Sequence, residues 1–344
     1  MIGDQHPFAV DEGDDDELFS EKSLRPRTLS EFIGQERVVE NLRLAIDGAK
    51  ARGEVLDHVL LSGMPGLGKT TLSYLIASEL GVRLHPHLGP NLERGKDLVG
   101  ILTGVERGDV VFIDEIHRMA PEAEEFLYSA MEDFRVDLML DKGPDARSVR
   151  LELQPFTLIG ATTREGLLTA PLLSRFEIPE RLDLYSDDEI DLVIRRSAKL
   201  LGCPIEPEAS RRLASRCRGT PRFANRFLRR IRDVAQARLD WKPGDELWID
   251  VESVEEGLRR LGIDEHGLGR VDRRLLEILI QHDDQPVGLK TLAASVGEDE
   301  RTIEDVYEPH LIRQGFVVKT ARGRRATAKA YELFSRRSSQ LELF

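Results

Sequence analysis

Short apolar stretches alternate with amphipathic segments in the first half of the chain. Four of these stretches have the length and composition of buried β-strands, and they span residues 58–62, 82–85, 109–113 and 156–160. The segments between them carry apolar residues at helical spacing. This alternation predicts an α/β domain at residues 21–184, with a mostly parallel sheet covered by helices on both faces.

The pattern changes to a period of two around residues 135–153. Apolar and polar residues alternate on both sides of the turn sequence Lys142-Gly143-Pro144-Asp145. Two short alternating stretches joined by such a turn are typical of a β-hairpin. We therefore expect a hairpin inserted into the α/β domain.

The second half of the chain has a helical pattern. Residues 185–261 predict a small all-helical domain. Residues 262–344 then predict helices at 272–282, 288–296 and 300–313, followed by short strands at 315–320 and 326–329. Three helices and a two-stranded ribbon joined by the basic turn 321–325 are typical of a winged helix.

Composition and charge narrow the class of protein. The net charge of −13 argues against a general nucleic-acid coat, although residues 319–329 hold five cations and no acid. Six acids between Asp11 and Glu17 indicate that residues 1–20 form an acidic flexible leader. With two cysteines, no secretory signal and no apolar run of about 20 residues, we expect a cytoplasmic protein without a membrane segment.

Gly63-Met64-Pro65-Gly66-Leu67-Gly68-Lys69-Thr70 fits the pattern of a phosphate-binding loop. It follows a predicted strand and precedes a predicted helix, which is the context that the pattern requires. Gly66 and the other glycines let backbone N–H groups approach phosphate oxygens. Lys69 can reach the β- and γ-phosphates, and the Thr70 hydroxyl can bind Mg²⁺. We therefore expect a nucleoside triphosphate, ATP, with Mg²⁺.

Two later strand ends complete a hydrolytic site. Asp114 would hold Mg²⁺ and Glu115 would polarise the attacking water. Thr162 or Thr163, at the end of the strand 156–160, can touch the γ-phosphate or the water, and Thr162 is our candidate. His117, in the run Asp-Glu-x-His, either couples hydrolysis to motion or begins the next helix, and the sequence leaves both open.

The order of these motifs, followed by Arg175-Phe176 and Gly219-Thr220-Pro221-Arg222, resembles the AAA+ ATPases. Longer stretches are similar to the RuvB family of Holliday-junction branch-migration motors. They include Leu24-Arg25-Pro26, residues 112–118, Ala130-Met131-Glu132-Asp133, residues 155–164 and, near the C-terminus, Pro286-Val287-Gly288-Leu289 and residues 302–306.

The resemblance implies specific roles. Arg175 would be an arginine finger acting on ATP in the neighbouring subunit of a homo-hexamer, and Arg222 a second nucleotide sensor. Other residues implied at the nucleotide are Leu24, Arg25, Gly66, Lys69, Thr70, Thr71, Glu132, Asp133, Phe134 and Tyr185. The DNA contacts implied are Lys319, Arg322 and Arg324.

The resemblance also implies partners and an activity. The hairpin, around Lys142 to Arg147, would dock on the junction-recognition protein RuvA, and a RuvC-type resolvase is a further candidate partner. The expected activity is ATP-dependent branch migration, with a ring pulling duplex DNA from a four-way junction. Two alternatives stay open at this point: another AAA+ remodeller of clamp-loader or initiator type, and a winged-helix regulator that uses ATP only as a ligand.

Overall fold

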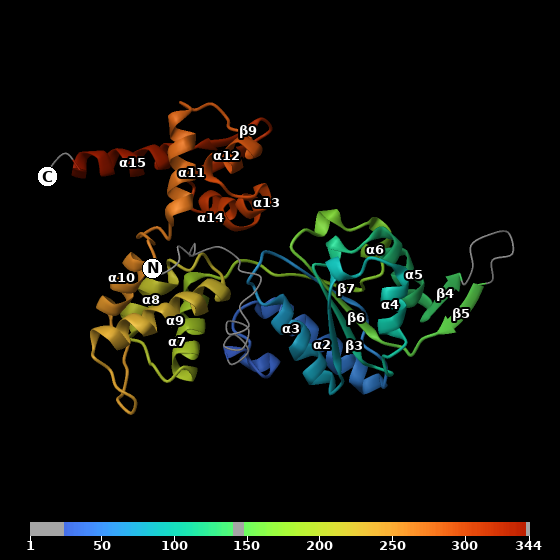
Figure 1. Cartoon of the computed structure of the whole chain (residues 1–344). Helices are drawn as coiled ribbons and strands as arrows, with labels where there is room; N and C mark the ends of the chain where they lie inside the picture. Colours follow the sequence, from blue (N-terminus) through green and yellow to red (C-terminus); the bar gives the residue numbers. More distant parts are fainter. Residues whose placement is uncertain (1–23, 140–147, 342–344) are drawn as a thin grey trace. The chain divides into compact units, whose positions relative to one another are not determined.

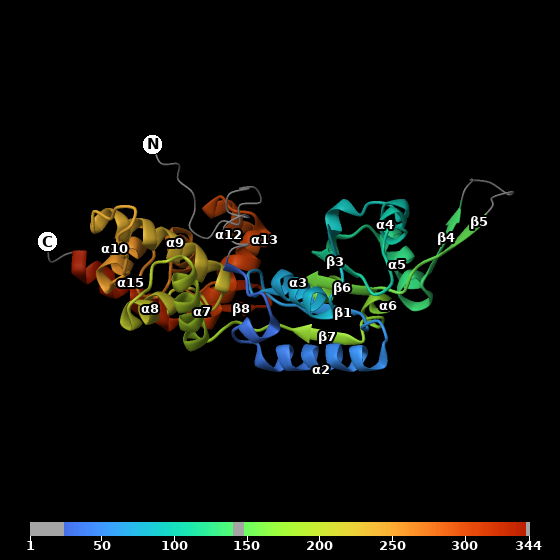
Figure 2. The same ribbon diagram turned by 90° about the horizontal axis from the view of Figure 1, so that it is seen from below.

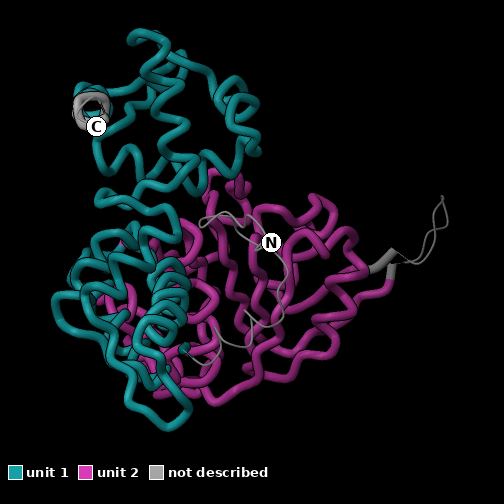
Figure 3. Tube along the Cα trace, turned by 60° about the vertical axis from the view of Figure 1, so that its left-hand side comes forward, with its two compact units in different colours: residues 1–24, 185–344 teal, residues 25–184 magenta. Residues whose placement is uncertain are grey.

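The computed structural model describes residues 24–139 and 148–341 of the chain. The chain forms two compact units (Figure 3). One unit comprises residues 25–184 and holds the parallel sheet, and the other comprises Leu24 and the residues from Tyr185 onward. The predicted fold class, an α/β ATPase domain followed by helical and winged-helix segments, is confirmed.

The first unit is built on a five-stranded parallel sheet with the strand order β2-β3-β6-β1-β7. Its strands are β1 (Val59–Ser62), β2 (Leu84–Leu88), β3 (Val110–Asp114), β6 (Thr157–Thr162) and β7 (Ile178–Arg181). Four of them match the predicted strands to within a few residues. The prediction missed β7 because its sequence, Ile-Pro-Glu-Arg, has little apolar character. An edge strand tolerates such a sequence, proline included.

Helices cover both faces of this sheet (Figures 1 and 2). They are α2 (Glu36–Arg52), α3 (Lys69–Leu80), α4 (Gly95–Leu102), α5 (Pro121–Asp133) and α6 (Ala170–Leu173), with short 3₁₀ turns η1 (Leu29–Glu31), η2 (Gly89–Asn91), η3 (Ile116–Arg118) and η4 (Glu165–Leu167). Leu98 of α4 and Leu127 of α5 join one core cluster with Ile113 of β3 and Leu158 of β6. Each such buried side chain contributes about 1.5–3 kcal/mol. This core holds the carboxyl ends of the central strands in fixed positions.

A two-stranded hairpin projects from the first unit, beyond α4 and α5 (Figure 1). Its strands β4 (Arg135–Met139) and β5 (Ser148–Glu152) pair antiparallel, with Val136 opposite Leu151. Phe134 anchors the base: its ring packs edge-on against Phe156 at 5.9 Å, and its carbonyl accepts a hydrogen bond from the Leu153 N–H. The tip, including the predicted docking stretch Lys142 to Arg147, lies outside the described residues.

The second unit begins with a helical lid. Its helices are α7 (Asp187–Leu200), α8 (Pro207–Ala214), α9 (Pro221–Arg238) and α10 (Val251–Arg260). Ser186 starts α7 with a capping box, because its hydroxyl accepts from the Glu189 N–H while the Glu189 carboxylate accepts from the Ser186 N–H. Thr220 caps α9 with its hydroxyl alone, which accepts from the Phe223 N–H at 3.4 Å. These caps fix where the two helices begin, and therefore where the turn before α9 lies within the lid.

A winged-helix segment follows the lid. It contains α11 (Arg270–Gln281), α12 (Leu289–Val296), α13 (Glu300–Thr302), a π-helical turn η5 (Ile303–Tyr307), α14 (Glu308–Arg313), β8 (Val317–Thr320), β9 (Gly323–Ala326) and α15 (Ala328–Leu341). The prediction for the last strand is wrong, because β9 spans 323–326 and Lys329 belongs to α15. Backbone pairing explains the shift: Arg324 exchanges both of its backbone hydrogen bonds with Val287 at 2.8 Å. The turn of the wing is therefore only Ala321-Arg322.

Candidate nucleotide-hydrolysis site

Three neighbouring strands end at the same edge of the sheet and carry the predicted catalytic residues. β1 leads into the phosphate loop, β3 ends at Asp114, and β6 ends at Thr162. β6 lies between β1 and β3, and Ser62 at the end of β1 is in register with Thr162. The carboxyl edge of an open α/β sheet is where ligands bind in this class of fold.

The phosphate loop depends on its glycines. Gly63, Gly66 and Gly68 have φ angles of 139°, 81° and 105°, which L-residues with side chains rarely adopt. At Gly63 a Cβ atom would lie 2.6 Å from the backbone oxygen of Leu182, so the loop is pressed against the chain that follows β7. α3 starts directly after Gly68, and no side chain caps its N-terminus among the residues that the structure describes. The backbone N–H groups at this helix start are suited to bind an anion.

Lys69 and Thr70 lie at the start of α3. The Lys69 ammonium donates to the carbonyl oxygens of Gly63 and Met64 at 2.7 and 2.9 Å, so it is folded back over its own loop. The Thr70 hydroxyl donates to Asp114 Oδ2 at 3.2 Å. Two hard oxygen ligands side by side at the end of a phosphate loop fit Mg²⁺, which prefers few protein oxygens and otherwise water and phosphate. Thr70 and Asp114 also line a cavity of about 440 Å³.

A chain of hydrogen bonds links Glu115 to the end of β6 through His117. Arg164 N–H donates to the Thr162 hydroxyl at 2.9 Å, and that hydroxyl lies 2.9 Å from His117 Nδ1. His117 Nε2 lies 3.3 Å from Glu115 Oε2. Because the carboxylate only accepts, Nε2 carries the imidazole proton and Nδ1 accepts from Thr162. The sequence left the role of His117 open, and the structure places it between the two predicted catalytic groups.

Arg175 and Glu132, both predicted to act at the nucleotide, contact each other. The Arg175 guanidinium donates to Glu132 Oε2 at 2.8 Å, to the carbonyl of Pro171 at 2.7 Å and to that of Tyr128 at 3.2 Å. It also lies 4.7 Å from the centre of the Tyr128 ring, within the range of a cation–π contact. The Glu132 side chain is 64% exposed, so solvent weakens this ion pair. The carbonyls of Pro171 and Tyr128 and the Tyr128 ring are the other contacts of the guanidinium.

The other implied nucleotide residues lie in several places. Thr71 follows Thr70 in α3, and Asp133 at the end of α5 pairs with Arg135 at 2.8 Å. Phe134 takes part in the aromatic cluster at the hairpin base rather than in the phosphate loop. In the first unit, Arg25 lies over the ring of Tyr74, with its guanidinium carbon 5.4 Å from the ring centre.

Three further implied residues belong to the second unit. Leu24 is buried, and its carbonyl accepts from the Arg196 guanidinium at 2.8 Å. Tyr185 is 1% exposed and donates its N–H to the carbonyl of Gly219 at 2.9 Å. Arg222 lies in the first turn of α9, directly after Pro221. Tyr185 is therefore hydrogen-bonded to the turn that directly precedes Arg222, the predicted sensor.

The wing residues differ in exposure. Lys319 and Arg322 are exposed, and Arg322 lies at the tip of the ribbon. Arg324, predicted to lie in the turn, instead lies in β9 with 8% of its surface exposed. Its guanidinium pairs with Glu308 and, at 3.0 Å, with Glu304. The sequence could not show this pairing, because Glu308 in α14 and Glu304 in η5 lie 16 and 20 residues before Arg324.

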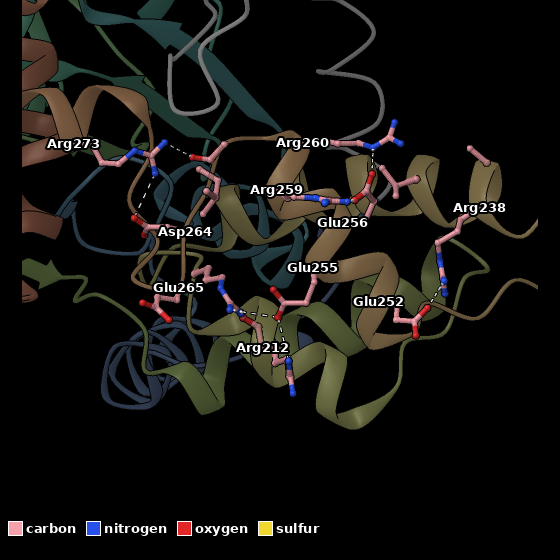
Figure 4. Close-up of a pocket in the computed structure, with 15 residues that line it drawn as sticks. Arg212, Arg238, Glu252, Glu255, Glu256, Arg259, Arg260, Asp264, Glu265 and Arg273 are labelled. Carbon is pink, nitrogen blue, oxygen red and sulfur yellow. Dashed lines mark hydrogen bonds and ion pairs between the residues drawn. The ribbon is translucent and has the colours of Figure 1, made fainter. Parts of the chain in front are cut away.

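A cavity of about 1170 Å³ in the second unit is unrelated to the predicted site (Figure 4). Both arginines and acids line this cavity, and they form ion pairs. Examples are Arg212 with Glu255 at 3.3 Å, Arg260 with Glu256 at 2.6 Å, and Arg273 with Asp264 at 3.4 Å. A lining neutralised in this way lacks the unpaired positive charge of a phosphate site. None of the predicted site residues lines it.

The parallel sheet, the phosphate loop and the acids at the end of β3 define a P-loop ATPase of the AAA+ class, with a helical lid and a winged helix. Family models match nearly all of the chain: the Holliday junction DNA helicase RuvB P-loop domain at residues 24–182, the RuvB AAA lid domain at 185–264, and the RuvB C-terminal winged helix domain at 265–335. The chain therefore belongs to the RuvB family.

Relatives and solved structures agree with this assignment. The Holliday junction branch migration complex subunit RuvB of Myxococcus xanthus is 52% identical over 92% of this chain and 91% of its own length. The protein of the same name from Fervidobacterium nodosum is 54% identical over 90% of this chain and 88% of its own. The Thermotoga maritima RuvB Holliday junction branch migration motor superposes with a TM-score of 0.81 and 47% identity, covering 91% of this chain and 98% of the other. No helix among the described residues has the length and apolar character needed to cross a membrane.

Proposed function

We propose that this chain is the ATP-driven subunit of a DNA motor that moves Holliday junctions by branch migration. The single observation that carries the proposal is the convergence of Lys69, Thr70, Asp114, Glu115 and Thr162 at one edge of the sheet, in a chain that belongs to the RuvB family along almost its whole length. These are the side chains that positioning and electrostatic catalysis of phosphoryl transfer require.

ATP would lie along the phosphate loop, with backbone N–H groups at Gly66 and at the start of α3 around its phosphates. Lys69 would exchange its two carbonyl partners for the β- and γ-phosphates. Thr70 and Asp114, already 3.2 Å apart, would hold Mg²⁺, which neutralises phosphate charge when bound. Thr71 would add a hydroxyl beside Thr70.

Glu115 would orient the attacking water, and its own position is set by His117. The His117 ring lies between the two residues, with Nε2 next to the Glu115 carboxylate and Nδ1 next to the Thr162 hydroxyl. Thr162 would report the γ-phosphate, so a change at Thr162 would reach Glu115 through one imidazole. A positioned carboxylate of this kind typically contributes 10²–10⁴-fold through general base catalysis.

A complete site would need two subunits. Arg175, with Glu132 and Asp133 near the end of α5, would face the nucleotide of the next subunit in a homo-hexameric ring. Phe134 would support that end of α5 from the hairpin base. An arginine supplied from a neighbour contributes on the order of 10³–10⁵ in rate when it completes a phosphoryl-transfer site. On the nucleotide's own subunit, Leu24, Arg25 and Tyr185 would lie near the base, and Arg222 would sense the phosphates.

The load would be duplex DNA at a four-way junction. Lys319 and Arg322, exposed on the wing, would contact phosphates without reading sequence, whereas the ion pairs of Arg324 with Glu304 and Glu308 would hold the ribbon in shape. The hairpin at 135–153 would dock on RuvA, with a RuvC-type resolvase as a further partner. We expect this work to take place in the cytoplasm, which suits the two buried free cysteines.

Branch migration of a synthetic four-way junction tests the proposal. Wild-type protein with RuvA and ATP should convert the junction to duplex products, and a non-hydrolysable analogue should not support the reaction. Glu115→Gln should bind ATP with unchanged affinity and give no products. ATP hydrolysis without migration, in the presence of active RuvA, would rule out the proposal, and ATP-dependent loading of a sliding clamp would favour a clamp-loader-type remodeller instead.

A further inference from the structure

A buried ion pair connects the lid to the winged helix. Arg218, in the turn before α9, is 2% exposed at its side chain, and Asp272, in the first turn of α11, is 0% exposed. The Arg218 guanidinium donates to an Asp272 carboxylate oxygen and, through Nε and Nη2, to the carbonyl of Gly267 at 3.2 and 3.0 Å. The same carboxylate oxygen accepts the Gly269 N–H at 2.7 Å. One lid side chain therefore binds both a helix start and a loop of the winged helix.

The backbone of Arg218 is unusual as well. Its φ of 57° is in the left-handed region, which is uncommon for a residue with a long side chain. Such a conformation persists only where the surroundings fix it. The guanidinium contacts hold the side chain of this same residue, and Gly219, Thr220 and α9 follow directly after the left-handed turn. Arg222, the predicted sensor, follows four residues later in the first turn of α9.

A second link meets the same turn. Tyr185, the first residue of the unit after residue 184, donates its N–H to the carbonyl of Gly219 at 2.9 Å. The carbonyl of Tyr185 accepts from the Arg313 guanidinium at 3.3 Å, at the end of α14 in the winged helix. The turn at 218–219 is therefore fixed to the winged helix twice, directly through Asp272 and indirectly through Tyr185.

Stability alone is a weak explanation for this arrangement. Burying two charges costs desolvation free energy, and well-packed apolar residues in place of a buried pair are often as stable or more stable. What apolar residues lack is direction, because a guanidinium donates only along the fixed directions of its N–H bonds. Here Nε and Nη2 both donate to the Gly267 carbonyl, and Nη2 also donates to Asp272. The pair therefore fixes the angle between the lid turn and α11 more closely than packing would.

We propose that Arg218 and Asp272 are positioning residues that make the lid and the winged helix move as one rigid lever. When the nucleotide displaces Arg222 and the lid, the winged helix then moves by the same rotation, and so does its DNA-binding wing. The lever rests on the proposed function, because it presumes that nucleotide turnover is coupled to DNA movement. It adds that the coupling requires a buried ion pair that contacts neither ATP nor DNA.

The main test replaces both charges together. The double variant Arg218→Met/Asp272→Leu leaves no lone buried charge, but the Gly267 carbonyl and the Gly269 N–H lose their side-chain partners. It should therefore fold with a lowered melting temperature. Its ATP hydrolysis without DNA should stay within about twofold, whereas the amount of junction converted per ATP hydrolysed should fall about tenfold or more. Arg212→Met, which removes a lid arginine from exposed pairs, is the matched control and should keep normal coupling. A folded double variant with normal coupling would overturn the proposal.

A conservative variant gives a second decision. Arg218→Lys keeps the charge and loses the fork, so it should lower the amount of junction converted per ATP by about threefold or more at unchanged ATP affinity. If the double variant fails to fold, this variant decides alone: normal coupling in Arg218→Lys would contradict the lever.

A distance measurement tests the lever even if branch migration is not the function. Spin labels at Arg230→Cys in α9 and Lys290→Cys in α12 report the separation of lid and winged helix. The two native cysteines are buried, and burial raises the pKa of the Cys203 thiol to about 11, so they react slowly with the label. The distance distribution should be narrow and independent of nucleotide in the wild type, and should broaden in the double variant. A distribution equally narrow in both would refute the lever, whereas absence of junction migration in the wild type would refute only the proposed function.

Discussion

Replacing Thr162 by valine removes the hydroxyl that joins β6 to His117, at nearly constant side-chain volume. Thr162 is fully buried, and its hydroxyl accepts from the Arg164 N–H and donates to His117 Nδ1, each at 2.9 Å. Valine can do neither, so a backbone N–H and a ring nitrogen each lose a hydrogen-bond partner at a buried position. His117 then loses the contact that fixes its ring opposite Glu115.

The size of the effect follows from these two bonds. Leaving a buried polar group without its partner costs about 1–3 kcal/mol. We therefore expect Thr162→Val to lower the free energy of unfolding by about 2 kcal/mol. If the same contact holds Glu115 in its reactive position, the activation barrier rises by a similar amount, which corresponds to a loss of about 30-fold in kcat.

Steady-state ATP hydrolysis and equilibrium ATP binding, measured on the same preparations, test this prediction. The Kd for ATP should change much less than kcat because the phosphate loop stays intact, and Thr162→Ser should recover most of the lost rate because it restores the hydroxyl. A variant that loses stability but hydrolyses ATP at the wild-type rate would show that the Thr162–His117 contact is only structural, and the relay to Glu115 would be refuted.

Further predictions concern pH, the ring and the wing. Burial lowers the pKa of His310 to about 3. The pKa of a histidine in the unfolded chain is near 6.5, so the free energy of unfolding is highest above that pH and falls by about 2 kcal/mol between pH 7 and pH 5. His310→Gln should flatten this pH dependence in urea unfolding. An unchanged pH dependence in the variant would count against a role of His310. Lys69→Ala and Arg175→Ala should each be inactive alone but regain turnover when mixed, and a mixture without activity would contradict a site shared between subunits. Arg322→Ala should weaken DNA binding alike for all sequences and make its salt dependence shallower. Arg324→Ala should instead lower the free energy of unfolding by about 3 kcal/mol, since it leaves Glu308 buried without its main partner, and a stable variant would show that the pair is dispensable.

The sequence predicted the strands that end at the carboxyl edge of the sheet well because its signals there are local. The phosphate loop, the acids after β3 and the threonine after β6 each follow an apolar strand, and parallel strands bring their carboxyl ends together. The same local signals placed the hairpin strands and the three helices predicted after residue 262. The weak edge strand β7 was missed because its one buried side chain is a glutamate, Glu180.

Contacts between distant parts of the chain could not be predicted in this way. A basic stretch such as 321–325 suggests an exposed turn, yet Arg324 is buried because Glu304 and Glu308 from η5 and α14 compensate its charge. Arg218 and Asp272 are 54 positions apart, and the local spacing of apolar and polar residues around each of them does not indicate that they pair. His117 was recognisable as a candidate only from its spacing to Glu115, and its partner Thr162 lies 45 residues later.

The resting place of Arg175 has a consequence for assembly. In this chain the Arg175 side chain is occupied by Glu132, Pro171 and the Tyr128 ring. If Arg175 acts on a neighbouring subunit's nucleotide, as proposed, that nucleotide must displace these contacts. In a site shared in that way, these contacts would lower the apparent affinity of the subunits for one another and would keep ATP hydrolysis low at low protein concentration. The ion pair with Glu132 ends in an exposed carboxylate, and moderate salt screens such pairs. The protein concentration at which hydrolysis begins should then shift with ionic strength, and an isolated subunit would be a latent form of the enzyme.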